Sequence, residues 1–456
     1  MLRNSAALLL LIAPACVAAM AQAQPTPQSP TPTAMHPGTH KKQMSRDYKA
    51  IHNSAIIVDT HADTTQRLLD ENYDMANPTG YGGYLDFKTA REGNLGAEFF
   101  SIWVDDSNPA LKGKFAHRTL ELIDAVYEQA QKHPAQMRMC FSPEDIERNH
   151  AQTPHKLCAL MGIEGGHSIE NSLALLRDYY RLGVRYMTLT WSNSNDWADS
   201  SGDITNSNVK HHGGLTEFGK DVVREMNRLG MMVDISHVSD KTFYNAVTVS
   251  RAPVIASHSS ARALTNAPRN MTDEMLKAVA NGPRGGGVVM VNFYSAFVDE
   301  NFRKAYEGMA KERAAATAEL DQKLDAENAD AKTRATEEHK LSTQWANKIP
   351  RPPLSSLIDH IDHVAKVAGI DHVGLGSDFD GIPSSPEGID SAADLPKITQ
   401  ELVKRGYNEQ QIHKILGGNL LRVFHQVELV AKQIQKEEPT AEAGATHSAN
   451  EKDQPK

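Results

Sequence analysis

The sequence predicts an α/β protein in which eight parallel strands, each followed by a helix, close into a (β/α)₈ barrel of the TIM type. Short runs rich in β-branched residues recur along the chain, and most are followed by a segment with helical periodicity. These runs are apolar at successive positions, which is typical of parallel strands covered on both faces. The repetition of such units suggests closure into a barrel.

The expected strands and helices can be placed by residue number. The strand runs are, in chain order, 55–59, 97–104, 157–162, 185–190, 231–235, 254–257, 287–292 and 372–376. The clearest amphipathic segments between them are 168–182, 216–229, 240–250, 273–281 and 355–368. Several of these segments begin with Ser, Thr or Asp, the residues that helix N-caps prefer.

One segment interrupts this alternation after the seventh strand. Residues 299–349 are rich in Ala, Glu and Lys and contain few large apolar side chains, a composition with high helix propensity. We therefore expect an inserted helical hairpin. Two roles are open for it: it covers the mouth of the barrel, or it is a solvated decoration.

The N-terminal residues predict export. Residues 1–23 combine an early basic residue, an apolar run and a terminal Ala-Gln-Ala, the features of a secretory signal peptide. Pro14 interrupts the apolar run, which is shorter than the roughly 20 residues that span a bilayer. We therefore expect no transmembrane helix and a periplasmic or secreted protein. A lipoprotein anchored through Cys16 is the alternative.

The composition of the chain after residue 23 distinguishes a folded domain from the segments on either side of it. Residues 24–43 are rich in proline and small polar residues and predict an extended linker, and residues 436–456 predict a disordered tail. The folded domain is expected over 44–435, which suits an α/β barrel with insertions. The formal net charge is −9 and no basic stripe is present, so we expect small-molecule substrates and no nucleic acid.

Two cysteines, Cys140 and Cys158, remain after removal of the signal peptide. In an oxidising compartment they could form a disulfide. Two buried free thiols are the alternative.

Potential metal ligands follow the predicted strands, where barrel enzymes carry their chemistry. His61 and Asp63 follow the first strand and stand two residues apart, so in an extended chain both side chains lie on one face. The ends of the third, fifth, sixth and eighth strands supply Glu164, His237, His258, Asp378 and Asp380. Imidazole and carboxylate together form the ligand set that suits zinc.

The number of candidate ligands favours two ions. The chain has 20 histidines, so any single one indicates little, and core packing in a structural barrel is the alternative. His61, Asp63, Glu164, His237 and His258 together exceed what one catalytic zinc normally takes. We predict two Zn²⁺ bridged by Glu164 and a water or hydroxide, one held by His61 and Asp63 and the other by His237 and His258. Two cations lower the pKa of the shared water and polarise a substrate oxygen, so hydroxide can attack a carbonyl carbon.

A family resemblance supports this interpretation. HAD, GIEGGHS, RYMTLTWS, DISHVS, SHSSAR, APRNM, VNFY and GSDFDG resemble, in order, segments of the membrane (renal-type) dipeptidases, over residues 48–427. The resemblance implies a zinc metallopeptidase with the same ligands, bridged by a glutamate rather than a carboxylated lysine. It also implies dipeptide substrates, tolerance of a C-terminal D-residue, and therefore activity on cell-wall-derived dipeptides and some β-lactams. A homodimer is expected for the same reason.

The resemblance implies two further roles. Arg269 would bind the terminal carboxylate of the substrate, as a guanidinium can with two hydrogen bonds. A surface salt bridge is the alternative for Arg269. Asp378 would handle protons at the attacking water and at the leaving amine, staying ionised beside two cations. The alternative for Asp378 is a hydrogen bond to a ligand histidine, and Asp380 is expected to be structural.

One position departs from the family. Where members commonly have Thr-Leu-Thr-His after the fourth strand, this chain ends the same motif in Trp191. In the family that imidazole contacts the substrate carbonyl and stabilises the oxyanion, a contribution of about 3 kcal/mol at comparable donors. Three outcomes are open. Trp191 binds substrate and substitutes in part; Asn193, Asn195 or His167 supplies a donor; or the natural substrate differs.

The third outcome defines the alternatives to a dipeptidase. One is a related metal-dependent amide or lactone hydrolase, and the other is a peptide-binding protein that has lost turnover. Of the donors named above, His167 is also interpreted as a structural residue at a helix start.

Overall fold

The computed structural model describes residues 48–78, 83–106, 108 and 111–437. The predicted signal peptide with Cys16, the linker and residues 438–456 of the predicted tail lie outside these residues. Within the described ranges, no helix combines the length and the apolar character needed to cross a bilayer.

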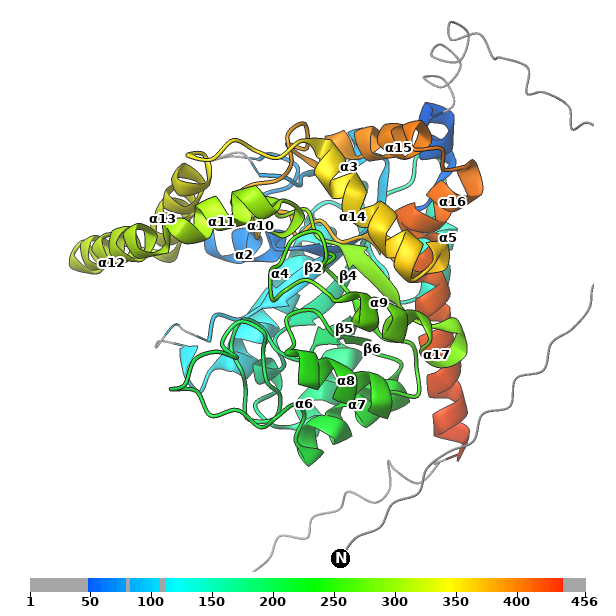
Figure 1. Ribbon diagram of the computed structural model, residues 1–456, viewed down its shortest axis with the longest axis horizontal. Coiled ribbons are helices and arrows are strands. Elements are labelled where there is room, and N and C mark those ends of the chain that lie inside the picture. The colour runs from blue at the N-terminus through cyan, green and yellow to red at the C-terminus, as the bar shows by residue number, and fades with distance from the viewer. Residues whose placement is uncertain (1–47, 79–82, 107, 109–110, 438–456) are drawn as a thin grey trace, which may run out of the picture. The chain divides into compact units, whose positions relative to one another are not determined.

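Parallel strands form a closed barrel, as predicted (Figure 1). The strands of the barrel are β1 (Ile57–Ala62), β2 (Leu95–Trp103), β4 (Leu157–Glu164), β5 (Val184–Thr188), β6 (Met232–Asp234), β7 (Ile255–Ala256), β8 (Val288–Val291) and β9 (Val373–Leu375). β1 pairs with β2 on one side and with β9 on the other, and β2 pairs directly with β4, which completes the ring. Each of the eight predicted strands is therefore present.

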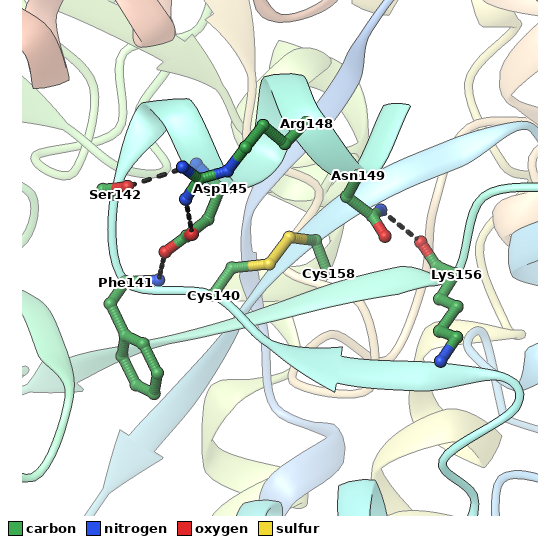
Figure 2. Close-up of a disulfide and its surroundings, with 8 residues drawn as sticks. All are labelled: Cys140, Phe141, Ser142, Asp145, Arg148, Asn149, Lys156 and Cys158. Atoms are coloured by element: carbon green, nitrogen blue, oxygen red, sulfur yellow. Dashed lines mark hydrogen bonds and ion pairs between the residues drawn. A yellow bond between two sulfur atoms is a disulfide. The ribbon is translucent and has the colours of Figure 1, made fainter. Parts of the chain in front are cut away.

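A further strand, β3 (Met137–Met139), was not predicted. It pairs with the beginning of β4 outside the closed ring, and three residues are too short for a periodic pattern to be seen. Cys140 follows β3 directly and forms a disulfide with Cys158 of β4, with a Cα–Cα distance of 5.6 Å. Figure 2 shows this bridge beside α5 (Pro143–His150). Of the two alternatives for the cysteines, pairing is the one observed.

Helices alternate with the strands and cover the barrel. They are α2 (Thr64–Asp70), α3 (Phe87–Glu92), α4 (Phe115–Lys132), α5, α6 (Leu173–Arg181), α7 (Glu217–Leu229), α8 (Asp240–Val249), α9 (Asp273–Ala280), α14 (Leu354–Val367), α15 (Leu395–Lys404), α16 (Glu409–His413) and α17 (Asn419–Glu437). Their N-caps follow the sequence signals: the side chains of Ser172, Thr216, Ser239 and Thr272 each accept a backbone N–H from the first turn.

The core lies in two layers. One cluster joins interior side chains of the strands, such as Phe99 and Tyr186, to α17, whose Phe424 ring lies 6.5 Å from that of Phe99. The larger cluster fills the space between the strands and the surrounding helices. Both layers bury apolar side chains from successive strand positions, which is why the strands read as continuous apolar runs.

The predicted insertion after β8 is helical. The predicted range, 299–349, contains α11 (Glu300–Gly308), α12 (Ala310–Ala326) and α13 (Ala331–Ala346), with α12 and α13 packed together as a hairpin. The short helix α10 (Ser295–Val298) precedes it. A small cluster that includes Phe302, Tyr306 and Ala346 forms its core and packs against Tyr294 beyond the end of β8. α13 also contacts α2, which follows the first pair of predicted ligands. The insertion is thus anchored beside the mouth, which is the carboxyl end of the barrel.

Candidate metal centre

The five predicted ligands meet at the mouth of the barrel. His61 and Asp63 stand at the end of β1, Glu164 ends β4, and His237 and His258 follow β6 and β7. Oε2 of Glu164 lies 3.3 Å from Nε2 of His61, which is 3.5 Å from Oδ2 of Asp63. Oε1 of the same carboxylate lies 2.8 Å from Nε2 of His237 and 3.4 Å from Nε2 of His258. The two oxygens of Glu164 therefore face two separate pairs of potential ligands.

The ring of His61 is oriented by a buried tyrosine. Its Nδ1 lies 2.8 Å from the hydroxyl of Tyr186, and that hydroxyl donates to the carbonyl oxygen of Thr60 at 3.0 Å. Since the hydroxyl proton is used on Thr60, Nδ1 of His61 is the donor in the first contact. Nε2 of His61 then carries a lone pair that points to the centre.

The ring of His258 is oriented by a serine and an aspartate. Its Nδ1 lies 2.7 Å from Oγ of Ser257, which donates to Oδ2 of Asp234 at 2.6 Å. By the same reasoning Nδ1 of His258 donates, and its Nε2 is free to act as a ligand. Asp234 also accepts the backbone N–H groups of Ser236 and Ser257 at 3.0 and 2.8 Å. It thereby fixes the loops that carry both histidines.

Tyr186, Asp234 and Asp59 were not among the predicted site residues. Asp59 accepts the backbone N–H groups of Ser377 at 2.7 Å and of His61 at 3.3 Å. It thereby fixes the loops that follow β1 and β9, as Asp234 fixes those that follow β6 and β7. A signal was available for both aspartates, because each is a carboxylate inside an otherwise apolar strand run. A buried charged group of this kind is retained only where it is hydrogen-bonded.

The ligand atoms fit a divalent cation. Nε2 of His61 and Oδ1 of Asp63 are buried without a hydrogen-bond partner in the described part of the chain. Nε2 of His237 lies 3.0 Å from Nε2 of His258. The donor atoms of His61, Glu164 and His258 all lie within 4.8 Å of one another. Imidazole nitrogens and carboxylate oxygens that converge in this way form the arrangement that a bound cation stabilises.

Asp378 lies in the same group. Its carboxylate has atoms within 4.8 Å of ligand atoms of His61 and Asp63, and Nδ2 of Asn292 donates to its Oδ2 at 2.8 Å. Burial, and the charges of Asp63 and Glu164, raise the pKa of Asp378 to about 8 although His61 opposes the shift. The negative charges of several buried carboxylates therefore repel one another at the centre, and bound cations would relieve that repulsion.

Two site residues adopt left-handed backbone conformations. His237 has φ 65° and Asp378 has φ 64°, which costs of order 1–3 kcal/mol for residues other than glycine. Both stand in loops that follow strands, and both side chains reach the ligand cluster. Asp380 also has a positive φ but accepts from Thr64 Oγ1 at 2.6 Å and from the backbone N–H of Tyr84 at 2.9 Å, in agreement with a structural assignment.

Arg269 lies beside His237 and His258. Its guanidinium donates to Oγ of Ser259 and to the carbonyl oxygen of His258, each at 3.2 Å, and its Nε has no partner in the described chain. It lines a hollow with His237 and Ser259. No carboxylate of the described residues forms a salt bridge with it, so the alternative of a surface ion pair does not hold.

Trp191 lies at the edge of the centre. Its ring centroid is 6.4 Å from that of His237 and 4.9 Å from that of Trp103, and its backbone carbonyl accepts a hydrogen bond from Ser200 Oγ. Trp191 is partly exposed.

Two of the alternative donors are engaged elsewhere. The side chain of Asn195 donates to the carbonyl of Leu189 and accepts the backbone N–H groups of Trp197 and Ala198. Nε2 of His167 lies 2.8 Å from the carbonyl oxygen of Val104, within a short 3₁₀ turn (Gly166–Ile169). Both residues therefore shape the loops around the mouth.

The chain has known relatives. The family model described as membrane dipeptidase, peptidase family M19, matches residues 45–438. An uncharacterized dipeptidase of Schizosaccharomyces pombe is 35% identical over 415 residues, which cover 87% of this chain and 86% of the relative.

Two solved structures share the fold. The probable dipeptidase PvdM from Pseudomonas aeruginosa has a TM-score of 0.71 at 25% identity and covers 86% of this chain and 100% of its own. A metallopeptidase from Rhodobacter sphaeroides, liganded with a phosphinate mimic of the dipeptide L-Ala-D-Ala, has a TM-score of 0.63 at 23% identity, with coverage of 82% and 99%. Taken with the family match and the relative that is 35% identical, the barrel and its ligand cluster identify a dipeptidase-type metallohydrolase, and the chain belongs to the membrane dipeptidase family, peptidase family M19.

Proposed function

We propose that this protein is a binuclear zinc dipeptidase. The observation that carries the proposal is that the two carboxylate oxygens of Glu164 face different ligand pairs. Oε2 faces His61 and Asp63, and Oε1 faces His237 and His258. His61 and Asp63 would hold one ion and His237 and His258 the other, with one oxygen of Glu164 offered to each. When bound, the two ions supply a Lewis acid for the scissile carbonyl and an activated water.

The side chains around the ions bind and orient the dipeptide. Arg269 binds the terminal carboxylate of the substrate through hydrogen bonds, since its guanidinium lies next to His237 and has an unused Nε–H. Trp191 packs against the bound substrate from the side of His237. Asp378, held in place by Asn292, accepts the proton of the attacking water and passes it to the amine that leaves.

The substrate class is proposed to include dipeptides with a D-residue at the C-terminal position, among them cell-wall-derived dipeptides. The Rhodobacter sphaeroides metallopeptidase of the same fold was liganded with a phosphinate mimic of L-Ala-D-Ala, and a phosphinate resembles the tetrahedral state of amide hydrolysis. A carboxylate held by Arg269 fixes the C-terminal residue by its backbone, which leaves its side-chain stereochemistry less constrained.

The test combines zinc content with hydrolysis. Purified mature protein should contain near two zinc ions per chain and should release free amino acids from an L,L and an L,D dipeptide, with activity lost on chelation and restored by zinc. Zinc at one ion per chain with full activity would contradict the binuclear proposal. Protein without zinc would contradict the metal centre altogether.

A second function is favoured by one observation, the tryptophan at position 191 where the family has histidine. A protein that binds two zinc ions but does not cleave dipeptides would be a related amide or lactone hydrolase, and N-acyl amino acids and lactones should then be turned over. Tight dipeptide binding without any hydrolysis would instead indicate a peptide-binding protein.

We also propose that the protein is exported as a homodimer. The disulfide between Cys140 and Cys158 supports a periplasmic or secreted location, because disulfides persist in oxidising compartments. The predicted cleavage after Ala23 is checked by the N-terminal sequence of the mature protein; a mature chain that begins with a lipidated Cys16 would indicate an anchored lipoprotein. Sedimentation of the purified protein reports the oligomeric state.

A further inference from the structure

Trp103 occupies a position at the centre that the proposed function does not use. It ends β2 and pairs in register with Glu164 on β4. Ser101, two residues earlier, donates through Oγ to Oε2 of Glu164 at 3.2 Å. Side chains two residues apart on a strand lie on the same face, so Trp103 points the same way as Ser101. It therefore lies one step nearer the mouth, directly beside the bridging carboxylate.

The indole of Trp103 has an unused donor. Its Nε1 is buried and has no hydrogen-bond partner among the described residues. A buried donor without an acceptor is destabilising, and such a group in a native structure calls for an explanation. The ring of Trp103 is 4.9 Å from that of Trp191, at an interplanar angle of 57°. The ring of Trp191 lies in turn 6.4 Å from that of His237, so the Trp191 ring lies between the ring of Trp103 and the ligand His237.

Another buried indole shows that an unpaired N–H is not sufficient by itself. Nε1 of Trp197 is also buried without a partner in the described chain, but Trp197 packs in the core against Phe218, with ring centroids 6.3 Å apart, and beneath Gly166. No substrate can reach that place. Trp103 differs because its strand position and its two neighbours place it at the centre.

We propose that Nε1–H of Trp103 donates a hydrogen bond to the scissile carbonyl oxygen of the dipeptide as negative charge develops on it. This inference rests on the proposed dipeptidase function. It assigns to Trp103 the oxyanion contact that the family's histidine would make from position 191. Trp191 keeps its contact with the bound substrate and also packs against the Trp103 ring. The indole N–H does not titrate in the range where proteins are folded, so this donor is available at every working pH.

The first experiment compares Trp103→Phe with Trp191→Phe in the zinc-loaded enzyme. Loss of one oxyanion donor costs about 10²–10³-fold in kcat, so Trp103→Phe should lower kcat by about 100-fold or more with little change in KM. Affinity for a phosphinate dipeptide mimic should fall in parallel. Trp191→Phe should have a smaller effect, seen mainly in KM. Trp345→Phe, in the inserted hairpin, is the matched control and should leave kcat, KM and zinc content unchanged.

The second experiment observes the donor directly. The chain has four tryptophans, so ¹⁵N-labelled protein should give four indole N–H resonances, and the Trp103 resonance is the one missing in Trp103→Phe. Addition of the phosphinate mimic should move the Trp103 resonance downfield as the N–H gains an acceptor. The Trp197 resonance should stay in place, because that ring lies in the core.

The outcomes separate this inference from the function on which it rests. Full kcat in Trp103→Phe together with an unmoved Trp103 resonance would overturn the inference and leave the dipeptidase intact. Loss of kcat in Asn193→Ala but not in Trp103→Phe would give the donor role to Asn193. If the wild type binds the mimic without hydrolysing any dipeptide, the proposed function fails while the resonance still reports on Trp103. If it neither binds nor hydrolyses, both proposals fall.

Discussion

At the scale of single residues, the centre depends on how its ligands are held. The imidazoles of His61 and His258 are each fixed through Nδ1, by Tyr186 and Ser257 respectively. Such partners set both the tautomer and the direction of the lone pair. The ligand residues define which metal can bind, and their partners define how well it binds.

Ser257→Ala should therefore weaken zinc binding. The substitution removes the acceptor for Nδ1 of His258 and the link to Asp234, and loss of a comparable partner lowers metal affinity or activity by about 10–100-fold. Zinc affinity measured by competition with a chromogenic chelator checks this. Ser250→Ala is the control, because Ser250 is also buried and hydrogen-bonded, to the carbonyl of Ala252, but lies at the end of α8. Equal zinc affinity in the two variants would contradict the assignment.

Glu98 gives a prediction about pH. It is fully buried on β2, and burial together with the neighbouring charge of Asp59 raises its pKa well above the ordinary value of 4.5. The folded protein then holds a proton that the unfolded chain has lost, so Glu98 contributes less to stability as the pH rises above 4.5. Glu98→Gln cannot titrate and escapes this loss.

The difference in Tm between Glu98→Gln and the wild type should accordingly shift in favour of the variant as the pH is raised above 4.5. Glu128→Gln, at an exposed position on α4, should show no such trend. A difference in Tm that is independent of pH would mean that Glu98 is ionised in the folded protein.

At the scale of elements, β3 and the insertion are additions to a regular barrel. The insertion packs on Tyr294 and contacts α2, so it is attached at the mouth of the barrel. Most residues of α12, farther along the insertion, are exposed. β3 is attached at the opposite end, next to the beginning of β4, where the disulfide joins Cys140 to Cys158. Glu164 stands at the far end of that same strand.

Replacement of both cysteines by serine should reduce stability without abolishing activity. The bridge closes a loop over a sequence separation of 18, for which chain entropy in the unfolded state gives about 3 kcal/mol. Urea unfolding of the double variant should match that of the wild type under reducing conditions. Dipeptide hydrolysis by the folded variant should be close to wild type, because the bridge lies at the start of β4 and Glu164 at its end. A lost zinc site in a folded variant would show that the bridge also positions the centre.

At the scale of the whole molecule, closure of the barrel is what creates the site. Residues separated by almost two hundred positions, such as His61 and His258, come together only because β1 and β7 end on the same rim. Parallel strands bring their carboxyl ends to one rim, which is why ligands could be recognised from their place after each predicted strand. If the barrel did not close, only His61 and Asp63, which are two residues apart in the sequence, would remain close together as metal ligands.

The sequence by itself determined the class of fold, the eight barrel strands, the helical character of the insertion and the residues that gather at the mouth. These follow from local patterns: apolar runs, helical periodicity, and polar residues placed just after strands. It could not determine β3, since three residues carry no period, nor the choice between a disulfide and two thiols, since that depends on the distance between β3 and β4.

Only the tertiary structure decided how each side chain is held. The division of Glu164 between two ligand pairs, the support of His61 by Tyr186 and of His258 by Ser257, and the unused N–H of Trp103 all arise between strands that are distant in the sequence. Hydrogen bonds of this kind depend on distances of a few tenths of an ångström and on direction. A linear pattern specifies which residues reach the rim, and the packing of the closed barrel specifies which atoms they offer there.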